Sequence, residues 1–275
     1  MATIVFDTYG KTRVRLTCVQ RNGNTHELRE LMVRILFTGD YSSSFTAADN
    51  TQILPTDTMK NTVYAVARQK PIVSIEQFAL ALADRFLSQV SVLKQVEIYI
   101  EETPWQRIGT HESAFVQTGS ERRTTTCTIS RTRQTFVAGL ANLQILKTSN
   151  SAFAGFLKDD FTTLAETDDR LLGTMLSADW TYGSADLDFN HSHAAVRANL
   201  LEVFANHASK SVQHTLFDMA EAVLNSFSTI AEIHLTMPNK HCLLVDLSKF
   251  GLDNPNQIFV PIDEPSGYIE ARVRR

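Results

Sequence analysis

The chain has 275 residues, with 26 lysines and arginines against 30 aspartates and glutamates, so its formal net charge is −4 at pH 7. This length is enough for about two domains with buried cores, which excludes a peptide hormone or a disulfide-stapled mini-protein. Its mildly acidic balance argues against a nucleic-acid partner, because such a protein carries a strongly basic surface.

The sequence contains no apolar run of about 18 residues, so we expect no transmembrane helix and no membrane partner. Its first residues lack the basic head and apolar stretch of a secretory signal, and its last residues are not a Ser-Lys-Leu peroxisomal address, which favours a cytoplasmic location. The three cysteines, Cys18, Cys127 and Cys242, lie far apart in the sequence. That usage is typical of free thiols in a reducing compartment.

The first half of the chain shows strand, helix and strand patterns in turn. Val14, Leu16 and Cys18 alternate with polar residues, and this alternation predicts a strand with one buried face. It is the first of two strands that we expect before residue 41. Helices are predicted over about 41–89, where Ser74 and Gln77 form a capping box. Two more strands follow, the second over Thr124–Ser130.

The second half repeats this order. Its predicted elements are strands near 134–148 and 169–182, a short helical insert over Gly155–Leu164, helices over His193–Asn206 and Ser211–Phe227, and a hairpin around 231–248 that turns at Pro238 and Asn239.

The repeated order predicts an α+β protein made of two tandem ββααββ units, residues 1–132 and 133–275. In each unit we expect an antiparallel sheet with helices on one face. Four-stranded sheets have open edges that must be paired, covered or charged. Association of these edges into an oligomeric β-barrel would pair them, so we expect self-association.

The commonest motifs for nucleotide, zinc and acyl-transfer sites are absent from the sequence: it has no Gly-rich phosphate loop, Cys-x-x-Cys pair, His-Glu-x-x-His helix or Gly-x-Ser-x-Gly elbow. Polar residues that simple packing does not require are concentrated in five segments. These are Tyr9-Gly10-Lys11, Thr56–Thr62, Phe153–Arg170, Ser211-Val212-Gln213 and Pro238–His241.

Several of these residues also have plain structural explanations. Lys11 can be a solvated charge at a strand start, and Thr56 and Asp57 are good helix N-caps. A helix start also offers free N–H groups to an anion, and Ser211 begins a helix at the equivalent place in the second half. The pair His191 and His193 has no carboxylate or cysteine ligand at conventional spacing, so we expect no metal there.

Taken together, the segments closely resemble the urate oxidase (uricase) family, whose members consist of two tandem tunnelling-fold (T-fold) units. The matching text is Tyr-Gly-Lys at 9–11, Thr-Asp-Thr-x-Lys-Asn-Thr-Val-Tyr at 56–64, Phe-x-Gly-Phe at 153–156, Thr-Thr-Leu-x-Glu-Thr-x-Asp-Arg at 162–170, Ser-Val-Gln at 211–213 and Leu-x-x-Pro-Asn-Lys-His at 235–241. These segments occur in family order and span most of the chain.

The resemblance implies oxidation of urate by O2 and water to 5-hydroxyisourate and H2O2 without metal or organic cofactor. It assigns urate binding to Phe153 by stacking, to Arg170 and Gln213 at the two purine edges, and to the backbones of Asp57 and Val212. These choices suit a planar anion, because arginine presents a bidentate fork and glutamine both donates and accepts.

The resemblance also implies that Lys11, Thr56 and His241 form a proton relay, while Thr56 and Asn239 hold oxygen, peroxide or water above the ring. In the family, Lys11 and Thr56 face the ligand from one subunit and the other site residues come from another, so a homotetramer is expected. Two other interpretations stay open from the residues: a pterin or purine enzyme of the same superfamily, and a catalytically silent purine-binding oligomer.

Overall fold

The structure is a computed structural model that describes residues 2–275. The elements of the first half are β1 (Tyr9–Asn22), β2 (Thr25–Gly39), α1 (Ser42–Ala47), α2 (Thr56–Gln69), α3 (Ile75–Gln89), β3 (Leu93–Thr103), β4 (Trp105–Arg107), β5 (Phe115–Gln117) and β6 (Arg122–Ser130). Those of the second half are β7 (Gln134–Lys147), β8 (Leu172–Tyr182), α4 (Phe189–Asn206), α5 (Val212–Ser226), β9 (Ile230–Thr236), β10 (Asn239–Leu244), the 3-10 turn Ser248–Phe250, β11 (Phe259–Gly267) and β12 (Glu270–Arg274).

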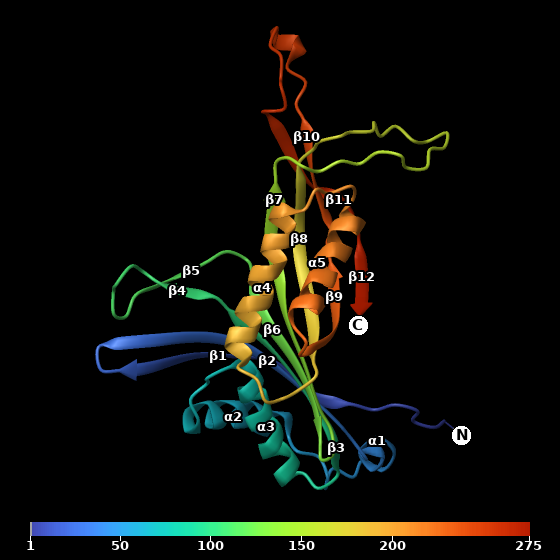
Figure 1. Cartoon of the computed structure of the whole chain (residues 1–275). Helices are drawn as coiled ribbons and strands as arrows, with labels where there is room; N and C mark the ends of the chain where they lie inside the picture. The colour runs from blue at the N-terminus through green and yellow to red at the C-terminus, as the bar shows by residue number, and fades with distance from the viewer. Residues whose placement is uncertain (1) are drawn as a thin grey trace. The chain divides into compact units, whose positions relative to one another are not determined.

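The α+β class is confirmed, and each half contains two strands, two main helices and two strands in that order. The additions are α1 and the small β4–β5 hairpin in the first half, and β11 and β12 at the end of the second. Figure 1 shows the helices and strands in chain order from blue to red.

Two compact units share the chain, but they are not simply its two halves. Unit 1 comprises the chain up to Gly139 together with Thr181–His193, and unit 2 comprises Leu140–Trp180 together with Ala194–Arg275. Strands β7 and β8 each contribute residues to both units. The boundary near residue 132 describes a repeat in the sequence rather than a compact unit, and it stays a prediction.

In unit 1 the strands follow the order β1-β2-β3-β6-β7. The pairs β1–β2, β2–β3 and β3–β6 are antiparallel. Helices α2 and α3 contact each other and pack against this sheet (Figure 1). Phe37 of β2 meets Phe86 of α3 with ring centroids 5.1 Å apart, and both side chains are buried. The expected cap of α3 is present, since Ser74 Oγ accepts a hydrogen bond from the Gln77 N–H at 3.1 Å.

The beginning of β1 lies unusually close to β2. A β-carbon on Gly10 would lie 1.9 Å from the carbonyl oxygen of Ile35, so only glycine fits at this position. The register then shifts between Lys11 and Val14, where Arg13 adopts a φ of 58°. A bulge of this kind re-aims neighbouring side chains.

The expected hairpin at Pro238 and Asn239 is wrong. Strands β9 and β10 do not pair with each other; both pair with β8, and their other partners are β12 and β11 respectively. Thr236 faces Glu270 and Asn239 faces Gly267, so residues 230–244 act as one interrupted strand along the C-terminal segment. The chain continues past Pro238 instead of turning back.

The helical insert expected over Gly155–Leu164 is also wrong, because this stretch has no helix. The Asp159 carboxylate accepts hydrogen bonds from the Phe161 N–H at 3.0 Å and the Thr162 hydroxyl at 2.8 Å. Such a local side-chain cap stabilises a turn in competition with a helix. The connection from β7 to β8 therefore leaves the sheet as an extended loop (Figure 1).

No helix within residues 2–275 is long and apolar enough to cross a membrane.

Candidate active site

Unit 1 holds three of the predicted site residues together where β1 and α2 begin. Helix α2 packs against β1. The Tyr9 hydroxyl accepts a hydrogen bond from the Leu54 N–H at 3.0 Å, which fastens the segment before α2 to β1. The pKa of Asp57 is lowered, chiefly by its hydrogen bond with Lys60 and further by the charge of Lys11. The charge of Lys11 therefore acts on the first turn of α2.

Thr56 is the first residue of α2, and it does not cap the helix. Pro55 occupies the N-cap position, and no side chain caps the first turn. The carboxylate of Asp57 accepts instead from Lys60 Nζ at 2.5 Å and from Asn61 Nδ2 at 3.0 Å. The structural explanation of Thr56 and Asp57 as caps is therefore wrong, and both residues are exposed at the helix start.

In unit 2, three segments that are distant in sequence are joined by backbone hydrogen bonds. The Phe153 N–H donates to the Thr167 carbonyl at 2.8 Å, and the Thr167 N–H donates back at 3.1 Å. On the other side, the Ala152 N–H donates to the Ser209 carbonyl at 2.8 Å. These bonds place Phe153 between the segment that leads to Arg170 and the segment that leads into α5.

Arg170 lies over Phe153, with its guanidinium carbon 5.0 Å from the ring centroid. The ring of Phe156 stacks on Phe153 at 4.9 Å and an interplanar angle of 14°. Burial lowers the pKa of Arg170 from its usual value, yet the group stays charged because arginine titrates far above neutral pH. Its Nε is buried without a hydrogen-bond partner among residues 2–275, so this cation is incompletely satisfied by the protein.

A cavity of about 320 Å³ opens beside Arg170, in the size range of small-molecule sites. Its wall includes Leu164, Thr167, Arg170, Asn239, His241 and Phe259. Asn239 is buried, and its Nδ2 lies 3.4 Å from His241 Nδ1. The β10–β11 register shifts between these two residues. Arg170, Asn239 and His241 thus offer a guanidinium, an amide and an imidazole to a ligand.

Val212 and Gln213 are the first two residues of α5; the valine is buried and the glutamine is exposed. Ser211 Oγ accepts from the His214 N–H at 3.1 Å. The N–H groups of the first helical turn have no partner within the helix, so those of Val212 and Gln213 are suited to an acceptor on a ligand. Neither residue lines the cavity, although Ser209 connects their segment to that of Phe153.

The predicted residues therefore form two groups. Unit 1 brings Lys11, Thr56 and Asp57 together, and unit 2 carries Phe153, Arg170, Val212, Gln213, Asn239 and His241. Sequence reasoning missed two residues that position these groups, Tyr9 and Thr167. Both lie inside the recognised segments, but neither has a pattern of its own that indicates its partner.

The pair His191 and His193 is not a metal centre in the described structure. The His193 ring is buried, with Nε2 3.0 Å from the Gly139 carbonyl, whereas His191 is exposed. A different group has metal-ligand geometry: His207, His214 and Asp218 of unit 2. Sequence reasoning did not single it out, although the i,i+4 spacing of His214 and Asp218 puts both on one face of a helix.

The different cap structures of α2 and α5 lead to a prediction about stability. Ser211→Ala should lower the free energy of unfolding by about 1 kcal/mol, because it removes a side-chain cap. Thr56→Ala, also at a helix start, should change it by less than about 0.5 kcal/mol. Urea unfolding of both variants checks this. An equal loss for the two would show that Thr56 does cap α2.

Together these observations define a class: an α+β protein of tandem antiparallel units, with a small-ligand cavity walled by arginine, asparagine and histidine. A family model described as Uricase matches residues 7–128 and 136–270. The uricase of Arthrobacter globiformis is 42% identical over 267 residues, covering 97% of this chain and 88% of the relative, and that of Dictyostelium discoideum is 35% identical over 282 residues, covering 100% and 98%. The chain belongs to the uricase family.

The solved structures agree with this membership. The crystal structure of uricase from Arthrobacter globiformis superposes with a TM-score of 0.95 at 41% identity, covering 100% of this chain and 96% of that one. A structure of Bacillus sp. TB-90 urate oxidase, 24% identical, shares the fold with a TM-score of 0.84, covering 98% of this chain and 100% of that one. The tandem T-fold architecture expected from the sequence is thereby confirmed.

Proposed function

We propose that this uricase-family chain oxidises urate with O2 and water to 5-hydroxyisourate and H2O2, using its own side chains and no metal or organic cofactor. Membership of the family makes it a urate oxidase, an oxidoreductase. The observation that supports the site best is Arg170, half-buried over Phe153 and lining the same cavity as Asn239 and His241.

Urate binding requires a stacking platform and polar partners at two edges of a planar anion. Phe153 supplies the platform, held by its paired backbone bonds with Thr167. Arg170 binds one edge through its planar fork, and Gln213 binds the other through its amide, assisted by the Val212 N–H. The backbone of Asp57 contributes at the purine edge. Support for Gln213 is its place in the first turn of α5, where the N–H groups of Val212 and Gln213 have no partner within the helix.

Catalysis requires a proton to leave the urate anion, to be stored, and to be returned as water attacks the oxidised ring. Lys11, Thr56 and His241 carry this proton, because a hydroxyl can donate and accept at once and an imidazole can take a proton on one ring nitrogen while it donates from the other. Asn239 and Thr56 hold O2, then peroxide, then water. The contact between Asn239 Nδ2 and His241 Nδ1 supports their joint action, and the free Thr56 side chain supports its role outside helix capping.

The direct test is an aerobic assay of the metal-stripped protein with urate. We expect loss of the ultraviolet absorbance of urate, one H2O2 formed for each urate consumed, and no turnover without O2. A chelator should leave the rate unchanged. Activity that disappears on chelation and returns only with a metal would overturn the cofactor-free mechanism, and binding without any turnover would favour the silent oligomer.

The two residue groups come together between subunits of a homotetramer whose sheets join edge to edge into a barrel. Each site then takes Lys11 from one chain and Arg170 from another. The support is the family assignment and the division of the groups between two units of the chain. We also place the enzyme in the cytoplasm, which the three free cysteines favour.

Mixing inactive variants tests the shared site. Lys11→Met and Arg170→Ala should each have low activity alone, but their co-expression should restore about one quarter of wild-type turnover, because random assembly gives that share of sites two intact contributions. The assay is urate turnover of the purified mixed tetramer at a urate concentration well below the wild-type KM, where the weaker binding of Arg170→Ala lowers its rate. If the mixture stays at the activity of the single variants, each site is built from one chain.

A further inference from the structure

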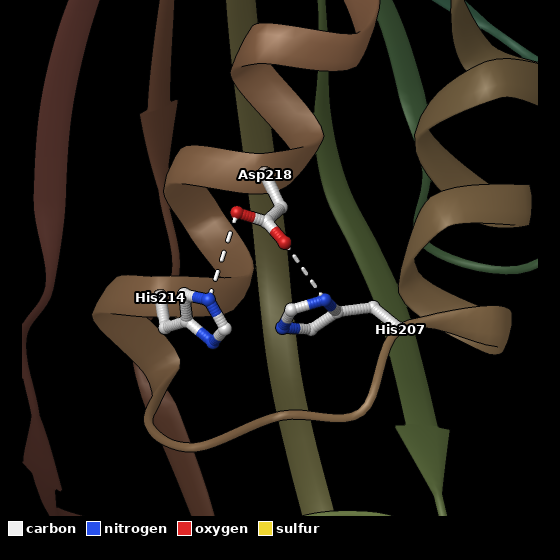
Figure 2. A group of neighbouring side chains, drawn as sticks. All are labelled: His207, His214 and Asp218. Carbon is white, nitrogen blue, oxygen red and sulfur yellow. Dashed lines mark ion pairs between the residues drawn. The ribbon is translucent and has the colours of Figure 1, made fainter.

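Three side chains of unit 2 converge where α4 ends and α5 begins (Figure 2). His207 follows α4, whereas His214 and Asp218 lie one turn apart on α5. His207 Nδ1 lies 2.9 Å from Asp218 Oδ2, and His214 Nε2 lies 3.8 Å from Asp218 Oδ1. One ligand atom from each of the three residues lies within 4.8 Å of the other two. Small rotations would bring all three onto one ion.

A simple ion pair accounts for only part of this arrangement. The His207 side chain is 10% exposed, and its Nε2 is buried without a hydrogen-bond partner in the structure of residues 2–275. Figure 2 shows this nitrogen on the side of the ring that faces His214, and the two ring centroids are 4.6 Å apart. A buried polar atom without a partner is costly and calls for a ligand.

The charge of the cluster also suits a cation, because the Asp218 carboxylate lies beside both imidazole rings. A competing cation, Lys147, donates through Nζ to the backbone carbonyl of His207 at 2.5 Å, which keeps the ammonium bonded to the main chain.

We propose that His207, His214 and Asp218 bind a divalent transition-metal cation, for which Zn²⁺ is the probe. Two imidazoles and one carboxylate match zinc, nickel or copper chemistry and disfavour calcium and magnesium, which prefer all-oxygen sites. Three protein ligands leave a fourth position for water. The ligands belong to the connection between α4 and α5 and to the first two turns of α5.

The role of this ion is structural rather than catalytic. His214 directly follows Val212 and Gln213, so a bound cation would fasten the beginning of α5 to the end of α4. The site requires neither urate nor the proton relay, and the inference stands apart from the proposed function. Stripping the metal is expected to lower the unfolding temperature without changing the rate of urate oxidation, because none of the three ligands is assigned to the urate site.

Isothermal titration of untagged, metal-stripped tetramer with ZnCl2 tests the site, and we expect one saturable equivalent per chain. His214→Ala is the main variant, because this side chain is 46% exposed and its loss should not disturb the fold. It should weaken Zn²⁺ binding on the order of 100-fold or more, since even second-shell changes reach that size. His191→Ala, at an exposed histidine on α4, should bind as the wild type does.

A thermal-shift measurement gives a second readout. Zn²⁺ should raise the unfolding temperature of the wild type and of His191→Ala, but not that of His214→Ala, and CaCl2 should raise none of them. Absence of a saturable equivalent in the wild type would overturn the proposal. Equal affinity of the wild type and His214→Ala for Zn²⁺ would overturn it as well, because the ion would then be bound by other histidines on the surface.

Discussion

Lys11→Met should lower kcat for urate on the order of 10²-fold or more, with a much smaller change in KM. This is the size expected when a general acid–base is removed from the transition state. Methionine keeps most of the length and apolar stem of lysine, so β1 should retain its pairing with Ile35. Steady-state kinetics monitored by urate absorbance provides the measurement, with circular dichroism as the check on folding.

Lys60→Met is the matched control. Lys60 lies in the same unit, on α2, and pairs with the exposed Asp57 carboxylate at 2.5 Å. Surface pairs of this kind contribute little, and the proposed role of Asp57 uses its backbone. Lys60→Met should therefore retain kcat within a few-fold. A large rise in KM with normal kcat for Lys11→Met would instead show that Lys11 binds urate without moving its proton.

How far the sequence predicts the fold depends on whether a feature is local. The alternation of Val14, Leu16 and Cys18, and the capping box of Ser74 and Gln77, predicted β1 and the start of α3 correctly because each pattern belongs to one element. Pairing at Pro238 failed because it depends on residues 259–274. Pro261 and Pro265 make the sequence of β11 untypical of a strand, because proline has no N–H to donate. In the structure β11 is the last strand in the order β8-β10-β11, and a strand at the edge of a sheet tolerates missing N–H donors.

The site shows the same division. The short sequence motifs shared with the family identified Lys11, Arg170 and His241, because each of these residues lies inside one of the matching segments. These motifs did not show that Pro55 takes the N-cap position, so that the Thr56 side chain does not cap the helix. Pro, Thr and Asp are all common at helix starts, and the sequence does not tell which of them is the cap. The cluster around Asp218 also went unnoticed, because His207 lies outside α5 and reaches it only through the path of the connecting loop.

Arg170→Ala should lower kcat/KM for urate by about 10- to 150-fold, the equivalent of about 1.5–3 kcal/mol for a charge-assisted hydrogen bond. The guanidinium is held 5.0 Å from the Phe153 centroid and has a buried Nε without a partner among residues 2–275. Its binding capacity is therefore available to a ligand. Arg170→Lys should recover only part of the loss, because an ammonium cannot bind an edge bidentately.

Anaerobic equilibrium binding of urate separates binding from turnover for Arg170, because the oxidation cannot proceed without O2. The dissociation constant should rise about as much as kcat/KM falls, since the contact forms in the ground state as well as in the transition state. Arg133→Ala, at an exposed arginine between β6 and β7, should leave both quantities unchanged. An unaltered anaerobic dissociation constant in Arg170→Ala would place the urate edge elsewhere in the cavity, and Asn239 and Lys240 would then be the first residues to test.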